Sequence, residues 1–338
     1  MAPHGIAKRV LLQDIANATG FTVNTVSRAL KNKTDISKAT CERIQQVAHD
    51  MGYVQNSIAS SLRLGCSRTL AVIVAGLSNP FYATMVDAIH DLAEAQGYTV
   101  LVLCTRDDEV QERQAILTAI GRQVDGILLC PSNQYRKNTT LIRSAGIPYV
   151  LVSRHAEADD SDSVLCNEET GGFLACKHLI EAGHRKLGYF YNGEVLYSSA
   201  ERTKGFLRAA HEAGIPREDI RFFKNTDDSA ATRELTRWKE EGVTGIFVFC
   251  DIEAWQLLEK LSALGMAKQF ALVGFDNIQG ILGIPTPLCT VDGAMREVTA
   301  TALALLLDRV QGDESPARHL VFPAKLVCRG SCQRSQEP

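Results

Sequence analysis

The chain has 338 residues, which is enough for two or three domains. Hydrophobic residues make up 45% and charged residues 22%, an ordinary balance for a globular protein that excludes a wholly disordered chain. No run of about 18 apolar residues occurs, so we expect no membrane span. The N-terminal stretch lacks an apolar core followed by small residues, so no secretory signal is expected.

The net charge of −3 hides an uneven distribution. Residues 1–68 carry nine basic and four acidic side chains, a balance of +5, whereas the rest of the chain balances to −8. A basic segment joined to an acidic body predicts that the basic segment binds a polyanion.

Ten cysteines are scattered along the chain. None forms a CxxC pair, and no spacing of Cys and His resembles a zinc site. Several end apolar runs, as Cys104, Cys130 and Cys250 do. We therefore expect buried, reduced thiols in a cytoplasmic protein, with no metal site and no cofactor.

Residues 12–52 show the periodicity of three short helices. Gly20 is expected to end the first helix and Thr22 to cap the second. Ala16, Gly20 and Val26 have the spacing of a helix-turn-helix, in which a small residue, a turn glycine and a β-branched residue lie where the helices cross. The expected inward-facing residues are Leu12, Ile15 and Ala16, then Val23 or Val26 with Ala29 and Leu30, then Ile44, Val47, Ala48 and Met51.

The outward side chains of the second helix are amides, hydroxyls and cations. Such groups form hydrogen bonds with base edges and phosphates in the major groove of DNA. A helical bundle with a solvated polar face is the alternative, and the local positive charge favours DNA binding. These residues are Asn24, Thr25, Ser27, Arg28 and Lys31.

Residues 56–63 could form a short helix with Ile58 and Leu62 on one face. Eight residues cannot hold a helix alone in water, so a flexible linker is the simpler interpretation of the residues by themselves.

Three segments, DIANATGFTVNTVSRAL, GYVQNSIASSLR and TLAVIVAGLSNPFY, resemble the lactose-repressor (LacI/GalR) family of bacterial transcription regulators. The resemblance extends from Leu12 to about Cys332. It implies that residues 56–63 are a hinge helix that folds on DNA, with Leu62 wedged between bases from the minor groove and Ala59 allowing two such helices to approach.

The resemblance also implies base contacts from Val23, Asn24 and Arg28, with phosphate contacts from other residues of the same helix. The complete set of expected DNA-binding residues is Thr22, Val23, Asn24, Thr25, Ser27, Arg28, Lys31, Asn56, Ala59, Leu62 and Arg63.

After Arg68, short β-branched runs alternate with helical stretches, a pattern that builds parallel sheets covered on both faces. The expected strands are Leu70–Ala75, Thr99–Cys104, Gly126–Cys130, Tyr149–Ser153, Leu187–Tyr191, Ile246–Phe249 and Ala271–Gly274. The expected helices are Tyr82–Ala95, Gln111–Ile120, Thr170–Ala182, Ala200–Ala213, Ala230–Glu241, Glu253–Leu264 and Met295–Val310.

The fold class expected from these patterns and the resemblance is an all-α helix-turn-helix domain followed by an α/β periplasmic-binding-protein-like (type I) effector domain of two doubly wound lobes. The expected domains are residues 1–55, a hinge and linker over 56–68, and an effector and dimerisation domain over 69–338. Its N-lobe would comprise about 69–166 and 296–322, and its C-lobe about 167–292 and 325–332. The resemblance implies a homodimer with the helix near Tyr82 at its interface.

Ligands of such sheets bind in loops beyond the carboxyl ends of the strands. The loop 78–82, the segment around Arg202 and the strand end at Asp276 are candidates, since guanidinium and carboxylate groups bind the oxygens and hydroxyls of a small effector. A buried helix-start aromatic, a surface arginine and an ordinary turn aspartate are the structural alternatives. The expected effector-binding residues are Phe81, Tyr82, Ser153, Ser198, Arg202, Cys250 and Asp276.

The chain departs from the family pattern at Ser153, Cys250 and Asp228, where family members often carry other residues. We therefore expect a sugar or sugar derivative, with an unusual sugar, a sugar acid or a nucleobase-like compound all open. Trp255 could stack on the ligand, although a tryptophan one turn into a helix more often packs in the core.

The sequence lacks a GxSxG nucleophile motif and a GxxxxGK[ST] phosphate-binding loop, so we do not expect an enzyme. We expect instead a homodimeric repressor of double-stranded operator DNA that responds to a small molecule. A sugar-binding solute receptor without DNA binding is the second interpretation.

Overall fold

The computed structural model describes residues 10–54, 66–132, 136–154, 160–192, 197–225 and 228–332. The chain forms two compact units, residues 1–67 and 68–338. The expected hinge residues Asn56, Ala59, Leu62 and Arg63 lie outside the described residues. Within the described part, every helix is too short or too polar to cross a membrane.

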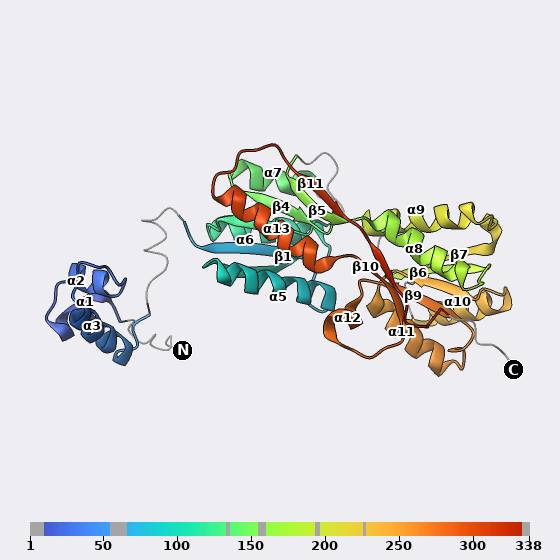
Figure 1. Ribbon diagram of the computed structural model, residues 1–338, viewed down its shortest axis with the longest axis horizontal. Helices are drawn as coiled ribbons and strands as arrows, with labels where there is room; N and C mark the ends of the chain where they lie inside the picture. The colour runs from blue at the N-terminus through green and yellow to red at the C-terminus, as the bar shows by residue number, and fades with distance from the viewer. Residues whose placement is uncertain are drawn as a thin grey trace, which may run out of the picture. The chain divides into compact units, whose positions relative to one another are not determined.

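In the first unit, the described residues form three helices around a small core (Figure 1). Gly20 ends the first helix with a φ of 77°, a conformation that glycine adopts readily, and Thr22 caps the second. Val26 rather than Val23 faces inward. The helices are α1 (Leu12–Thr19), α2 (Val23–Ala29) and α3 (Lys38–Asp50). The buried core residues are Ile15, Ala16, Val26, Ala29, Cys41, Ile44 and Ala48.

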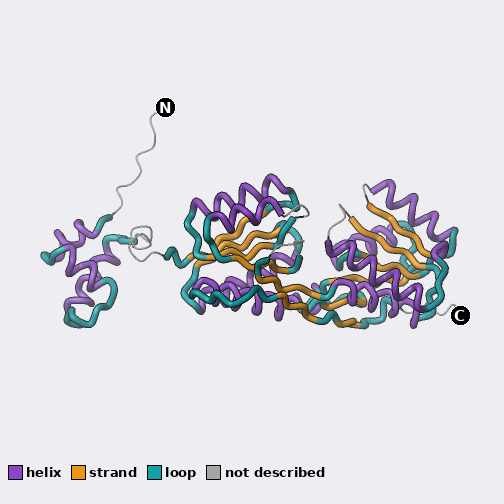
Figure 2. The backbone as a smooth tube through the Cα atoms, turned by 90° about the horizontal axis from the view of Figure 1, so that it is seen from above, coloured by secondary structure: helices purple, strands orange, loops and turns teal. Residues whose placement is uncertain are grey.

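The second unit contains two lobes, each with a six-stranded sheet between two layers of helices (Figure 2). The N-lobe sheet has the order β11-β5-β4-β3-β1-β2 and is parallel throughout. Its strands are β1 (Thr69–Val74), β2 (Thr99–Cys104), β3 (Gly126–Leu129), β4 (Tyr149–Val152), β5 (Asp162–Cys166) and β11 (His319–Phe322).

The central strand β1 shows why helices cover both faces of this sheet. Val72 and Val74 are buried against α5 (Pro80–Ala95) and α13 (Met295–Val310). The alternate residues Ala71 and Ile73 are buried against the opposite helix layer. A strand buried on both faces must be apolar at every buried position, as Leu70–Val74 of β1 is. The opposite layer consists of α6 (Glu109–Gly121) and α7 (Arg136–Ser144).

The C-lobe repeats this arrangement with the strand order β12-β10-β9-β8-β6-β7. Only β12 runs antiparallel to its neighbour among the described strands. Its strands are β6 (Leu187–Asn192), β7 (Ile220–Asn225), β8 (Gly245–Val248), β9 (Ala271–Phe275), β10 (Cys289–Asp292) and β12 (Lys325–Val327). Its helical elements are α8 (Glu168–Glu181), α9 (Tyr197–Glu212), η1 (Arg217–Asp219), α10 (Asp228–Glu240), α11 (Asp251–Ala263) and α12 (Ile278–Leu282).

The chain passes between the two sheets three times. It crosses between β5 and α8, between β10 and α13, and between β11 and β12. These three crossing segments place residues of both lobes next to one another.

The expected fold class is confirmed, with differences in detail. Helix α5 begins at Pro80 rather than Tyr82, because Asn79 caps it through a 3.0 Å hydrogen bond from the Phe81 backbone N–H. The expected strands did not include β5, β7, β10 and β11. These strands lie at or near the sheet edges, where polar residues interrupt the apolar runs.

Candidate DNA-binding surface and effector pocket

Helix α2 presents a polar surface to solvent. The side chains of Asn24 and Arg28 are exposed, and Val23 at the start of the helix is 36% exposed. The buried faces of Val26 and Ala29 fix the helix against the rest of the unit, so its outward face has one orientation. The helical period therefore places the base-reading candidates together on the solvent side.

Arg28 has one carboxylate partner, Asp35. Its Nε donates a 2.8 Å hydrogen bond to the Asp35 carboxylate, and both side chains are about half exposed. The hydrogen bond from Arg28 lowers the pKa of Asp35 below its usual range. Because exposed ion pairs contribute little to stability, Arg28 can exchange this partner for another acceptor.

The hydroxyl groups of α2 hold its first turn. The Thr22 hydroxyl accepts a 3.2 Å hydrogen bond from the Thr25 backbone N–H and lies 2.9 Å from the Thr25 hydroxyl. Ser27 and Lys31 are half-buried beside the exposed residues. All seven expected helix-turn-helix residues thus lie on or beside one helix, whereas the four hinge residues are outside the described part.

A small pocket lies where the two lobes meet. Ser153 follows β4 of the N-lobe and Asp276 follows β9 of the C-lobe, and both adopt left-handed backbone conformations, with φ of 64° and 97°. Such strained residues concentrate at functional sites. The cavity volume is about 20 Å³, room for about one water molecule. Its lining residues are Phe81, Ser153, Cys166, Glu168, Arg202, Phe275, Asp276, Gly293, Met295 and Val298.

Arg202 is the centre of this pocket. Its Nε donates a 2.6 Å hydrogen bond to Glu168, and its Nη2 lies 3.7 Å from the Asp276 carboxylate. Its Nη1 donates to the backbone carbonyl of Phe249, and the guanidinium carbon lies 3.4 Å from the ring centroid of Phe275. The side chains of Glu168, Arg202 and Asp276 are all buried and have lost their hydrating water. The attraction between the guanidinium and the two carboxylates offsets part of that desolvation cost.

Two glycines bring Glu168 to Arg202. A Cβ on Gly172 of α8 would lie 2.0 Å from the Arg202 carbonyl oxygen. A Cβ on Gly205 of α9 would lie 1.8 Å from the Glu169 carbonyl oxygen. Only residues without a side chain allow α8 and α9 to pack this closely, and the close packing places the carboxylate beside the guanidinium.

The pocket holds more negative than positive charge. Burial raises the pKa of Asp276 to about 6, with Arg202 opposing and Glu168 adding to the shift. Above this pKa, Asp276 carries a negative charge. Asp276 and Glu168 together then outweigh the single charge of Arg202.

Tyr82 does not line the Arg202 pocket. Its hydroxyl accepts a 2.7 Å hydrogen bond from Arg154, which also pairs with Asp107, and the tyrosine is buried. It lines a second, wider cavity of about 520 Å³ at the carboxyl edge of the N-lobe sheet. The other residues of that lining are Ala75, Gly76, Leu77, Ser78, Asn79, Cys104, Arg106 and Asp107.

Two more expected effector residues do not line the Arg202 pocket. Ser198 is buried in the first turn of α9, and Cys250 is buried at the N-cap of α11. Of the seven expected residues, the pocket brings together Phe81, Ser153, Arg202 and Asp276. Trp255 packs against the apolar core of the C-lobe.

Glu168 and Phe275 line the Arg202 pocket but are not among the expected effector-binding residues. Glu168 begins α8, where an acidic residue simply complements the helix dipole, so its sequence position carries no signal of a binding role. Phe275 ends the apolar strand β9, directly before Asp276, and resembles an ordinary core residue.

Three family models match the chain. Residues 11–56 match "Bacterial regulatory proteins, lacI family", and residues 67–237 match "Periplasmic binding proteins and sugar binding domain of LacI family". Residues 176–332 match a "Periplasmic binding protein-like domain". The matches define a bacterial regulatory protein with a DNA-binding unit and a ligand-binding unit.

Relatives and solved structures match over nearly the whole chain. The "HTH-type transcriptional repressor PurR" of Actinobacillus pleuropneumoniae serotype 3 is 30% identical, covering 95% of this chain and 97% of the relative. The same-named repressor of Aliivibrio salmonicida is 27% identical, covering 96% and 99%. A LacI-family regulator from Silicibacter pomeroyi has a TM-score of 0.80 at 23% identity, covering 96% and 100%.

The operator-bound Lac repressor dimer has a TM-score of 0.81 at 20% identity, covering 96% of this chain and 100% of its own. Together, these matches place the chain in the LacI family of bacterial transcription regulators. The resemblance seen in the sequence is thereby confirmed.

Proposed function

We propose that this regulator acts as a repressor, and that two copies bind a pseudo-palindromic operator in double-stranded DNA. Each copy would insert α2 into the major groove of one half-site, because a two-fold symmetric protein requires two-fold related half-sites. The exposed polar face of α2 supports this proposal, since it presents Asn24 and Arg28, and asparagine and arginine are the residue types that pair with adenine and guanine edges. Such binding occurs in the bacterial cytoplasm.

The remaining polar residues of the same helix would position the protein on the duplex. Thr22, Thr25, Ser27 and Lys31 lie beside the base-reading candidates, where hydroxyl and ammonium groups suit phosphate oxygens. The hinge would add Asn56, Ala59, Leu62 and Arg63 at the minor groove.

The effector would bind at Arg202 and Asp276, with Glu168, Ser153 and Phe81 around it. The excess of carboxylate favours a neutral, hydroxyl-rich molecule over an anionic one, because hydroxyls donate to carboxylates and accept from the guanidinium. Solved LacI-family structures contain D-xylulofuranose, cellobiose or ribose. We therefore favour a neutral sugar over a sugar acid.

Effector binding would also require the pocket to widen. Ligand pockets occupy about 300–1,000 Å³, whereas the cavity at Arg202 is about 20 Å³. A ligand that fits only a more open arrangement of the lobes shifts the population toward that arrangement. A coupling of about 1–3 kcal/mol would then change operator affinity by about 5- to 150-fold.

Two measurements test the proposal. Fluorescence anisotropy on duplex DNA selected from random sequence should show affinity that falls steeply as salt rises. Thermal-shift screening should show a higher melting temperature with a neutral sugar than with sugar acids or purines.

The outcomes distinguish the two interpretations. A protein that melts higher with a sugar but binds no duplex at any salt concentration would favour a solute receptor. Stabilisation by a sugar acid alone would overturn the proposed preference for a neutral ligand.

A further inference from the structure

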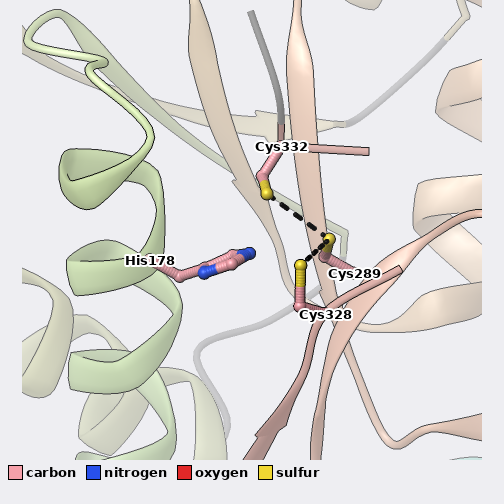
Figure 3. Close-up of side chains that lie close together, drawn as sticks. All are labelled: His178, Cys289, Cys328 and Cys332. Atoms are coloured by element: carbon pink, nitrogen blue, oxygen red, sulfur yellow. Dashed lines mark hydrogen bonds between the residues drawn. The ribbon is translucent and has the colours of Figure 1, made fainter. Parts of the chain in front are cut away.

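Three cysteines and one histidine meet at the amino edge of the C-lobe sheet, opposite the edge that carries Asp276. His178 comes from α8, Cys289 begins β10, and Cys328 and Cys332 follow β12 (Figure 3). Their four potential ligand atoms all lie within 4.8 Å of one another. These residues come from three segments that are far apart in sequence, so the fold brings the segments together.

The sulfur spacing matches a tetrahedral metal site. The Sγ of Cys289 lies 3.7 Å from that of Cys328 and 3.6 Å from that of Cys332. In a zinc tetrahedron with bonds of about 2.3 Å, two sulfur ligands lie about 3.8 Å apart. The same distances are far longer than the disulfide bond length of about 2.05 Å.

The histidine supplies a fourth donor. Its ring points from α8 toward the three sulfurs (Figure 3). The Nε2 atom of His178 is buried and makes no hydrogen bond to nitrogen or oxygen. A buried polar atom normally has a partner, and a metal ion between this nitrogen and the sulfurs would provide one.

The surrounding backbone holds the sulfurs in place. The Arg329 N–H donates a 3.2 Å hydrogen bond to the Sγ of Cys289, and the Cys289 N–H donates to the Ser331 hydroxyl. Between Cys328 and Cys332, Gly330 adopts a φ of 98°, which allows the chain to turn so that both thiols face Cys289. Such contacts around the ligands orient metal sites and favour the thiolate form.

We propose that His178, Cys289, Cys328 and Cys332 bind one Zn²⁺ ion. Four donors of the Cys₃His type form a closed tetrahedral site, as structural zinc requires. The ion would fasten the segment after β12 to both β10 and α8. A disulfide would use only two sulfurs and leave the third cysteine and His178 without a role, so the complete set favours the metal.

Metal content of the full-length chain, purified under reducing conditions, tests the proposal. Mass spectrometry of the metal should find about one zinc per chain in the unaltered protein. Cys328→Ser and His178→Gln should each lose most of it, because a closed site needs all four ligands. The matched control is Cys104→Ser, since Cys104 is also exposed but lies on β2 of the N-lobe.

Two further readouts separate a bound ion from a folding defect. Cobalt added to metal-free protein should produce thiolate-to-cobalt absorption in the unaltered chain and in Cys104→Ser, and none in Cys328→Ser. A chelator should lower the melting temperature of the same two proteins but leave Cys328→Ser unchanged.

Zinc retained equally by both ligand variants would overturn the proposal. So would metal-free protein, purified in parallel without reductant, in which peptide mapping finds a disulfide between two of Cys289, Cys328 and Cys332.

Discussion

The two units hold their candidate binding arginines, Arg28 and Arg202, in opposite environments. Arg28 in the DNA-binding unit is 44% exposed and pairs with one half-exposed carboxylate. The side chain of Arg202 in the effector unit is 6% exposed and contacts two buried carboxylates and two aromatic rings. An arginine in an exposed ion pair can exchange its carboxylate for another acceptor at little cost. In a buried cluster, the loss of one contact leaves a buried charge unpaired, which is costly unless another group replaces that contact.

This difference suits the two tasks. A DNA-reading arginine must reach a base without rearrangement of its own unit. An effector-sensing arginine should respond only when a ligand replaces existing contacts, because that replacement couples binding to the arrangement of the lobes. The following predictions test this contrast between an exposed and a buried cation.

The largest effect is expected for Arg202→Met. Removing the guanidinium leaves Glu168 and Asp276 buried without their cation. The free energy of unfolding of the second unit, residues 68–338, should therefore fall by about 3–5 kcal/mol. Urea denaturation measures this loss, and thermal shift should show no effector response. Arg208→Met is the control, because Arg208 pairs with Glu169 at the surface. An unchanged urea midpoint would contradict the buried-cluster interpretation.

We expect the Arg28 guanidinium to form two hydrogen bonds with a guanine edge. Arg28→Ala should then weaken operator binding by about 5- to 150-fold and relax the preference for one base pair. Anisotropy titrations with operator variants measure both effects. The free energy of unfolding of the second unit, residues 68–338, should not change. Lys38→Ala serves as the control, since Lys38 is 92% exposed on α3. Equal losses on operator and random DNA would show a phosphate contact only.

Asp251→Asn should change the pH dependence of stability. Burial raises the pKa of Asp251 to about 8, so the folded chain keeps a proton that the unfolded chain releases above about pH 4. The stabilisation is complete below pH 4 and is lost as pH rises through 8. The stability difference between unaltered and variant protein should fall by up to about 1.4 kcal/mol per pH unit.

Urea midpoints between pH 6 and 8 check this prediction. The asparagine can still accept the 2.9 Å hydrogen bond from the Ile278 N–H and donate to the Thr290 hydroxyl, so the variant should fold. Parallel pH curves for the two proteins would show that Asp251 is ionised in the folded state.

The smallest effect is expected for Asp35→Asn. Removing the carboxylate that holds Arg28 should tighten DNA binding by less than about fivefold. Asp50→Asn changes the charge equally without touching Arg28, so it isolates the contribution of the pair. Indistinguishable anisotropy curves for the two variants would mean that only net charge matters.

Local patterns were sufficient to predict the helix-turn-helix. The spacing of Ala16, Gly20 and Val26 specified two helices and their turn, and the structure chose Val26 over Val23 as the inward residue. Central strands such as β1 were also predictable, because burial on both faces demands a continuous apolar run. Edge strands such as β11 escaped detection, since most of its residues are exposed.

The binding clusters were predicted only in part. Arg202 and Asp276 stand at recognisable helix and strand ends, but Glu168 reaches them only because Gly172 and Gly205 let two helices pack closely. Tyr82 lies in the same helix as Phe81, yet its hydroxyl accepts a hydrogen bond from Arg154, and it lines the second cavity rather than the Arg202 pocket. The sulfur cluster gave no sequence signal, since its members span residues 178–332.

The amino-acid sequence by itself determined the family, the α/β fold class and the residues on the outer face of α2, because helical and strand periodicities act over a few neighbouring residues. Only the tertiary structure decided that Arg202 is enclosed by two carboxylates and that His178 faces three thiols. Those contacts join residues from separate strands and helices, and only the packing of the sheets and helices sets their distances.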